Sequence, residues 1–361
     1  MSDQVNEDSF INDSREAAEF KTVTFSGYKT TDVKRELLLA LYNAKIENAC
    51  YWSAELVCAG HFMDAWELII FYLGKHVHLG NPKLAIYIDK RFQVFRNIML
   101  QELFYNELQL RNSSTIRQIF AEICCVLATS PKKPTIESVK INKEEEFDMT
   151  QISLKLKATS TLFAEPILKK NDPAEIAISV NEFAFHLTSN APNMSLACYW
   201  IEWLIAFDRI CKQKKHNCFI ESRTNIPVEY KFQKELIWIL WDALFFSIKD
   251  DKFSLKIMHS ILNLFCIKFT PSCIKKRVHL LYFAVSVVTE PYRRTVPMIH
   301  HIDTVENTLK HINTVYKQIK SSEISPKTDY LFSGLKEKSN LAKTVGKIEL
   351  LNSMDILHNS G

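Results

Sequence analysis

Residues 62–77 read FMDAWELIIFYLGKHV and carry the strongest structural signal in the chain. Their apolar side chains recur three and four positions apart, which is the spacing of one face of an α-helix. The residues on this face are Phe62, Ala65, Trp66, Ile69, Ile70, Leu73 and Val77. The stretch therefore predicts an amphipathic helix that buries its tryptophan-bearing face.

The residues on either side of this stretch predict where helices begin and end. Gly60 is expected to end the preceding helix, and Gly80 to form a left-handed C-cap, because glycine adopts positive φ angles without steric cost. Asn81 followed by Pro82 is typical of an N-cap with proline in the first turn. We expect this next helix to run from Pro82 to about Leu110.

The same periodicity continues along most of the chain and predicts an all-α fold. Further apolar stripes of helical spacing occur in residues 37–41, 49–57, 116–127, 176–187, 201–205, 232–244, 255–265, 274–285 and 305–319. The chain has only 7 glycines in 361 residues, which argues against the glycine-rich turns of sheet proteins. Hydrophobic residues at 47% and charged residues at 24% are normal for a packed globular protein.

Composition shifts divide the chain into five predicted regions. Residues 1–20 hold six acidic residues and one basic one, which predicts a mobile acidic arm with a short strand at Phe20–Phe25. Two prolines and the run KEEE at 143–146 predict an inter-domain linker. The regions are an acidic arm (1–30), a first helical domain (31–130), a linker (131–150), a second helical domain (151–320) and a polar tail (321–361).

An internal repeat links the two predicted domains. The tetrapeptide Ala49-Cys50-Tyr51-Trp52 recurs as Ala197-Cys198-Tyr199-Trp200. Each copy follows a segment that we expect to form a helix beginning near an acidic residue, Glu36 or Glu182. Two copies are too few for a solenoid, so we predict two related multi-helix halves. Tyr51, Trp52, Tyr199 and Trp200 are expected to be structural residues within them.

The start of the chain and the cysteine count favour an intracellular protein. No apolar core of signal-peptide length is present near the N-terminus, and the cysteine count of 9 is odd. We therefore expect reduced cysteine side chains and no secretion. No stretch stays apolar for the roughly 20 residues that a bilayer span needs, so no membrane segment is predicted.

The motifs of common enzymes are missing from the sequence. There is no phosphate-binding loop, no dinucleotide fingerprint and no nucleophile elbow. Glu202 and Asp208 could form an acid–base pair, but nothing in their spacing is diagnostic. We predict no catalytic residue and no cofactor, and an enzyme with scattered active-site residues remains an alternative.

Cys211, His216 and Cys218 are the best candidates for a metal site. Thiolate and imidazole are ligands that suit zinc, but a structural zinc ion needs four of them. Cys266 or Cys273 would have to be brought in by the fold. The alternative is a set of loop and helix-end residues that bind no metal.

Basic residues gather towards the C-terminal half of the chain. The net charge is only +4, but residues 271–320 hold eight Lys and Arg against three Asp and Glu. Three groups are candidates for contacts with nucleic-acid phosphates or an acidic partner, and they are Lys212, Lys214 and Lys215; Lys275, Lys276 and Arg277; and Arg293 and Arg294. The alternative is an ordinary solvated helix surface.

Residues 34–85 carry a local resemblance to a known family. The matching positions are the run Ala49-Cys50-Tyr51-Trp52-Ser53-Ala54, then Gly60, then Gly80-Asn81-Pro82 with Leu84-Ala85. This pattern resembles the C-terminal helical oligomerisation region of AAA+ ATPases related to clamp loaders, especially the replication-associated recombination branch. The resemblance implies collar-like helix packing or oligomerisation. It implies no hydrolysis, because the phosphate-binding loop of that family is missing.

The whole chain also resembles proteins of large nucleocytoplasmic DNA viruses, which implies an infected-cell or virion setting. We expect a non-catalytic helical scaffold or adaptor in a DNA replication or recombination assembly, which binds itself or other proteins. A viral structural or assembly protein is the main alternative. A peptide-binding module is a variant that an exposed apolar groove would favour.

Overall fold

The computed structural model describes residues 7–101, 107–142, 147, 152–153, 155–188, 192–216 and 218–324. In this part of the chain, eleven α-helices are joined by loops and short 3-10 turns. The described residues form no β-strand, and their only extended pairing is an isolated bridge between Val23 and Lys29. The prediction of an all-α fold is confirmed.

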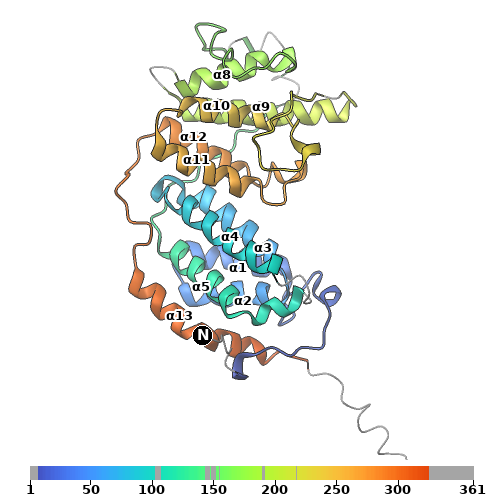
Figure 1. Cartoon of the computed structure of the whole chain (residues 1–361), viewed down its shortest axis with the longest axis vertical. Helices are drawn as coiled ribbons and strands as arrows, with labels where there is room; N and C mark the ends of the chain where they lie inside the picture. The colour runs from blue at the N-terminus through green and yellow to red at the C-terminus, as the bar shows by residue number, and fades with distance from the viewer. Residues whose placement is uncertain are drawn as a thin grey trace, which may run out of the picture.

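The helices form two bundles that lie one above the other (Figure 1). The N-terminal bundle contains α1 (Thr30–Tyr42), α2 (Ile46–Cys58), α3 (Phe62–Tyr72), α4 (Leu84–Gln101), α5 (Ser114–Thr129) and, from the far end of the chain, α13 (Ile302–Lys320). The C-terminal bundle contains α8 (Ala177–Thr188), α9 (Met194–Gln213), α10 (Ile237–Ser247), α11 (Lys252–Phe265) and α12 (Val278–Thr289).

Gly60 ends α2 as predicted. Its φ is +79°, in the left-handed region. The N–H of His61 donates to the carbonyl of Leu56 at 2.8 Å, and the N–H of Gly60 donates to the carbonyl of Val57 at 3.1 Å. These two bonds form a Schellman motif, which satisfies carbonyl groups that the helix end would otherwise leave unpaired.

The predictions for Gly80, Asn81 and Pro82 are wrong in detail. Gly80 does not have a positive φ, and it is required for a different reason, since a Cβ there would lie 2.2 Å from the carbonyl oxygen of Pro131. The side chain of Asn81 donates to the carbonyls of Pro297 and Met298 at 3.1 and 3.2 Å instead of capping a helix. Pro82 lies in the turn before α4, which begins at Leu84.

The predicted helix over 62–77 is also interrupted. After Tyr72 the backbone continues as a π-helical turn, Leu73–Val77, and then as a 3-10 turn, His78–Gly80. The helix predicted to reach Leu110 is shorter as well: α4 ends at Gln101, and residues 107–112 form a separate 3-10 turn. Helical spacing of apolar residues marks the buried face but does not fix the hydrogen-bond register.

The prediction of a free acidic arm is wrong for residues 7–29. Ile11, Phe20 and Phe25 are each at most 2% exposed. The guanidinium carbon of Arg15 lies 4.8 and 4.7 Å from the ring centroids of Phe20 and Phe25. The segment therefore packs on the N-terminal bundle, and the strand expected at Phe20–Phe25 is reduced to the single bridge at Val23.

The second predicted domain, 151–320, is too long, because α13 packs on α5 and α2 of the N-terminal bundle. Val305, Ile312, Tyr316 and Ile319 of α13 are buried. The chain descends from α12 to α13 along the left side of Figure 1. The apolar stripe of α13 shows that one face must be covered, but a stripe cannot show which distant surface covers it.

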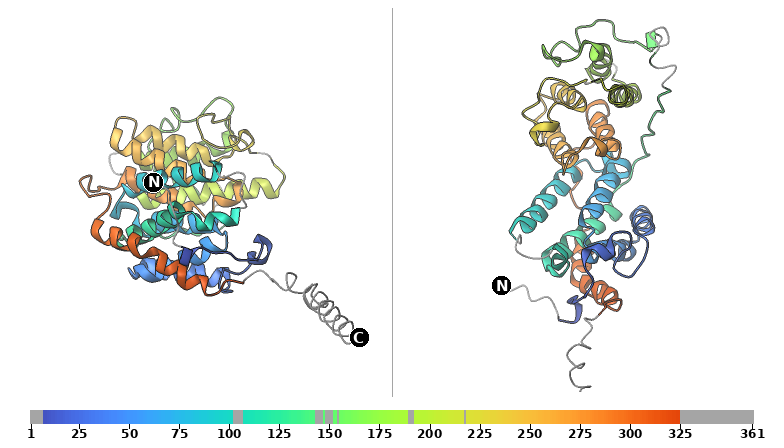
Figure 2. Two further views of the ribbon diagram at one scale, coloured as in Figure 1. Left: turned by 60° about the horizontal axis from the view of Figure 1, so that its bottom comes forward. Right: turned by 90° about the vertical axis from the view of Figure 1, so that its right-hand side faces the viewer.

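The predicted linker, 131–150, is described over 131–142 and at 147, and it contains no helix there. Its first residues lie against the N-terminal bundle, because the N–H of Lys133 donates to the carbonyl of His76 at 2.9 Å. Figure 2 shows this connection on the outside of the molecule. Most of the predicted polar tail, from residue 325 onward, lies outside the described residues.

The two bundles share one hydrophobic core. At their junction α11 packs on α4, and α12 packs on α3 and the π-helical turn. The amide of Asn263 donates to Asp89 at 2.9 Å across this junction. All nine cysteines are free and buried. Within the described residues, no helix combines the length and apolar character that a bilayer crossing demands.

Candidate functional site

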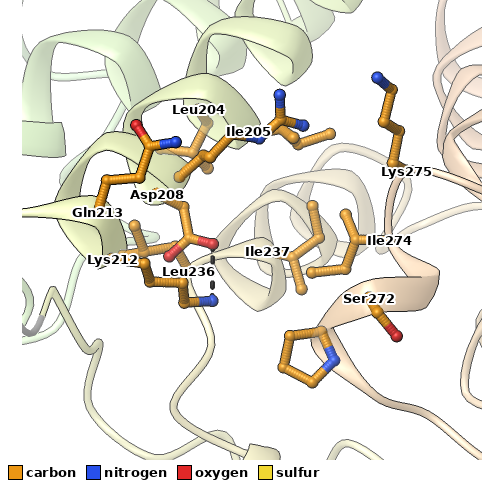
Figure 3. A pocket seen from close by; sticks show the side chains of 12 residues that line it. Leu204, Ile205, Asp208, Lys212, Gln213, Leu236, Ile237, Ser272, Ile274 and Lys275 are labelled. Atoms are coloured by element: carbon orange, nitrogen blue, oxygen red, sulfur yellow. Dashed lines mark hydrogen bonds and ion pairs between the residues drawn. The ribbon is translucent and has the colours of Figure 1, made fainter.

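A surface cavity of about 490 Å³ lies between α9, the start of α10 and residues 271–275 (Figure 3). We call it the α9–α10 cavity. Its apolar lining residues are Leu204, Ile205, Leu236, Ile237, Pro271 and Ile274. Its polar lining residues are Asp208, Arg209, Lys212, Gln213, Ser272 and Lys275. An apolar lining with a few polar groups is typical of ligand and partner sites.

The sequence of α9 explains how one helix supplies both kinds of lining. Leu204, Asp208 and Lys212 are four residues apart and therefore lie on one helical face. Towards the start of α9 this face is apolar, and in the last turns it becomes charged. The opposite wall comes from the 3-10 turn Pro271–Cys273 and the residues that follow it.

The charges around the cavity are unequally neutralised. The ammonium group of Lys212 lies 2.8 Å from Asp208 and 2.7 Å from Glu235. Burial by itself would lower the pKa of Lys212, but these two hydrogen bonds outweigh it and raise the pKa. Arg209 and Lys275 form no ion pair within the described residues. The cavity therefore presents two unpaired cations, and Lys212 is held by two carboxylates.

Glu202 and Asp208, the pair considered for acid–base chemistry, are not brought together. The hydroxyl of Tyr282 donates to Glu202 at the contact between α9 and α12. Burial raises the pKa of Glu202, although Tyr282, Lys275 and Arg209 each partly oppose this. Only Asp208 lines the cavity, where it is paired with Lys212.

The metal candidates are only partly assembled. The end of α9 is a second Schellman motif, in which the N–H of His216 donates to the carbonyl of Cys211 at 2.9 Å and Lys215 has a φ of +56°. This turn brings the thiol of Cys218 into hydrogen-bonding contact with that of Cys211, while the His216 side chain is exposed. The described residues contain no group of three or more candidate ligands placed to hold a metal ion.

The structure separates the predicted basic residues into paired and unpaired groups. Arg277 is 3% exposed, pairs with Glu67 and donates to the carbonyl of Phe265 at 2.7 Å, so its assignment to partner contacts is wrong. Arg294 is exposed but pairs with Asp251. Among the basic residues predicted from the sequence, those that are exposed and form no ion pair within the described residues are Lys214, Lys215, Lys275, Lys276 and Arg293.

These cations do not form one continuous stripe. Lys275 and Lys276 precede α12, whereas Arg293 follows it, so the length of a 12-residue helix separates them. At 1.5 Å per residue this length is about 18 Å. The fold does bring Lys212 and Lys275, which are 63 positions apart in the sequence, to the same cavity.

Arg209 and Glu235 were missed by the sequence reasoning. Arg209 lies three residues before Lys212 on α9, so helical spacing could have grouped the two cations. No local pattern marks Glu235, which precedes α10 and reaches Lys212 only in the folded chain. The apolar lining was likewise predicted as ordinary core, because a stripe does not show where its cover is incomplete.

Comparisons of the chain with protein-family models, curated proteins and solved structures found no match.

Proposed function

We propose that the protein is a non-catalytic helical scaffold or adaptor that binds a partner protein through the α9–α10 cavity. The observation that carries this proposal is an apolar recess next to two unpaired cations, Arg209 and Lys275. Such a recess accepts an apolar anchor side chain. The cations favour a partner segment that carries carboxylates beside the anchor.

The magnitudes fit an adaptor contact. Burying one Leu or Phe side chain is worth about 1.5–3 kcal/mol. Each exposed ion pair at the rim adds roughly 0.2–1 kcal/mol. One such contact gives weak binding, so we expect the cavity to work as the centre of a larger interface.

Two comparable double variants test this proposal. In Arg209→Glu/Lys275→Glu the rim cations are reversed, whereas Lys256→Glu/Lys310→Glu makes the same charge change at exposed residues outside the cavity. Each protein is affinity-purified from its native source and its co-purifying proteins are quantified. We expect the rim variant to recover at least tenfold less of the principal co-purifying protein than the natural chain does. The control variant should recover as much as the natural chain. Equal recovery by both variants would refute the cavity as the partner site.

A DNA replication or recombination assembly is the setting that we propose for this adaptor. The resemblance of residues 34–85 to the clamp-loader-related collar supports it. The exposed and unpaired cations Lys214, Lys215, Lys275 and Lys276 also suit phosphate contacts.

The DNA part is tested by fluorescence anisotropy with duplex and single-stranded oligonucleotides between 50 and 200 mM salt. We expect affinity to fall with salt, and Lys214→Ala/Lys215→Ala to weaken binding equally for all sequences. Absence of binding at about 50 mM salt would eliminate nucleic-acid contact and leave the protein-adaptor proposal in place.

A further inference from the structure

A second depression, separate from the α9–α10 cavity, lies between α2 and α13 and has a volume of about 760 Å³. We call it the α2–α13 groove. Tyr51 and Trp52 line it from α2, and both rings are partly exposed. Their centroids are 5.0 Å apart with the planes at 78°. Tyr28 makes a second edge contact with Trp52 at 5.5 Å. The aromatic wall of the groove is therefore fixed by neighbouring rings.

The polar lining of this groove includes three neutral side-chain amides. The side-chain amides of Asn48, Asn307 and Gln318 line the groove and form no hydrogen bond within the described residues. Nδ1 of His311 lies at hydrogen-bonding distance, 2.9 Å, from the carbonyl oxygen of Asn307. Among the described residues that line the groove, Glu47 is the one acidic residue and none is Lys or Arg.

This chemistry selects among possible occupants. A groove without cations does not suit a nucleic-acid backbone, whose binding depends on Lys and Arg. A docked α-helix satisfies its backbone groups internally and leaves neutral amide donors unused. An extended peptide in the polyproline II conformation has no internal hydrogen bonds, so its carbonyls need such donors. Aromatic-lined grooves are the sites at which proline-rich segments bind.

The length of the groove agrees with this occupant. On α13 its lining runs from Asn307 to Gln318, which is 11 residue steps. At 1.5 Å per residue the wall is about 16 Å long. A polyproline II segment rises 3.1 Å per residue, so about five of its residues span the wall.

We propose that the α2–α13 groove binds a short proline-rich segment of a partner protein in the polyproline II conformation. Trp52 and Tyr51 pack against its proline rings, and Asn48, Asn307 and Gln318 donate to its carbonyls. Glu47, which is exposed near the start of α2, favours a basic residue at one end of the segment.

The test uses the full chain and a fluorescein-labelled peptide of sequence Arg-Pro-Pro-Ala-Pro-Pro-Ala-Pro-Pro, followed by fluorescence anisotropy. A matched peptide has alanine in place of every proline. We expect the proline peptide to bind at least tenfold more tightly than the alanine peptide. Trp52→Ala should weaken binding at least tenfold, and Trp52→Phe should retain most of it because an aromatic face remains.

A surface variant keeps the test decisive if Trp52→Ala does not fold. Asn307→Ala/Gln318→Ala changes only exposed side chains and should weaken binding three- to tenfold. Arg209→Glu/Lys275→Glu should leave peptide binding unchanged, which separates this proposal from that for the α9–α10 cavity. Equal binding of both peptides, no binding at millimolar concentration, or no effect of the groove variants would each overturn it.

Discussion

The two copies of the Ala-Cys-Tyr-Trp tetrapeptide occupy similar local structures but different surroundings. One lies in α2, which packs on α1, and the other in α9, which packs on α8. The Tyr51–Trp52 rings meet at 5.0 Å and 78°, and the Tyr199–Trp200 rings at 5.1 Å and 81°. Trp200 is 1% exposed, however, whereas Trp52 is partly exposed at the α2–α13 groove.

The difference comes from the helices that cover each pair. The α1–α2 pair is covered by α5 and by α13, a helix more than 240 residues away in the sequence. The α8–α9 pair is covered by α10 and α12, which follow it within 90 residues. A shared tetrapeptide therefore specifies the helix and the ring geometry. The helices that cover each pair determine whether its tryptophan is buried in the core or lines a groove.

Each pair also contains a buried carboxylate that fixes a preceding loop. Glu55 of α2 accepts hydrogen bonds from the hydroxyls of Thr24 and Ser26 at 2.8 and 2.6 Å. Glu182 of α8 accepts from the backbone N–H groups of residues 157 and 158 at 2.9 Å or slightly more. The carboxylate lies on the second helix of the α1–α2 pair but on the first helix of the α8–α9 pair. Its position therefore does not follow from the tetrapeptide repeat.

Truncation of each tryptophan gives the strongest test of this difference in burial. Trp200→Ala should lower the free energy of unfolding by about 3–5 kcal/mol, because it leaves a large cavity in the C-terminal bundle. Trp52→Ala should lower the free energy of unfolding by about 1–2 kcal/mol, since part of that ring is already in water. Urea denaturation followed by circular dichroism measures both values.

Phenylalanine variants at the same positions are the controls, and we expect each to recover more than half of its loss. Equal destabilisation by Trp52→Ala and Trp200→Ala would show that the two tryptophans are buried alike and would remove the basis of the comparison.

The buried carboxylates give the next largest effect. Glu55→Gln and Glu182→Gln should each lower the free energy of unfolding by about 1.5–3 kcal/mol, because each removes charge-assisted hydrogen bonds to buried groups. The released loops should differ. Limited proteolysis should cut Glu55→Gln within residues 20–29 and Glu182→Gln within residues 155–170. Cleavage at the same sites in both variants would contradict this assignment.

The smallest effect concerns histidines where the bundles meet. Burial, aided by Lys75, lowers the pKa of His76 and of His279 to about 4. The unfolded chain therefore binds more protons than the folded one between about pH 6.5 and 4, so stability is full above pH 6.5 and declines as the pH falls to 4. At pH 5 each histidine should lower the free energy of unfolding by about 1 kcal/mol relative to its value above pH 6.5, after allowance for partial exposure.

His279→Gln should make the decline in stability between pH 6.5 and 4 shallower, as measured by urea denaturation at several pH values. His311→Gln is the matched control, because that side chain is exposed on α13, away from the junction of the two bundles. A slope that both variants leave intact would assign the acid sensitivity to other groups.

The positions of the helices were predicted better from the sequence than the contacts between them. Apolar spacing located α2, α5, α11 and α13, and Gly60 correctly ended α2. The acidic composition of residues 1–20 masked the fact that Ile11 and Phe20 are anchors. Charge density was misleading in the same way at Arg277, whose partner Glu67 lies 210 positions away.

The candidate site could be predicted only in part. Lys212 and Lys275 were named from local charge, but their meeting at one cavity required α9 and residues 271–275 to pack together. Asp208 and Glu235 both pair with Lys212, whereas Arg209 and Lys275 form no ion pair within the described residues.

The sequence by itself determined that this chain is helical and that its tryptophan-bearing stripes must be covered, because periodicity is a local property that each segment carries alone. Only the tertiary structure decided that α13 returns to the N-terminal bundle and that the α9–α10 cavity and the α2–α13 groove are left open. An apolar face gains free energy from burial against any complementary surface, since the hydrophobic effect is not directional. Which surface it meets is fixed by the packing of the whole chain.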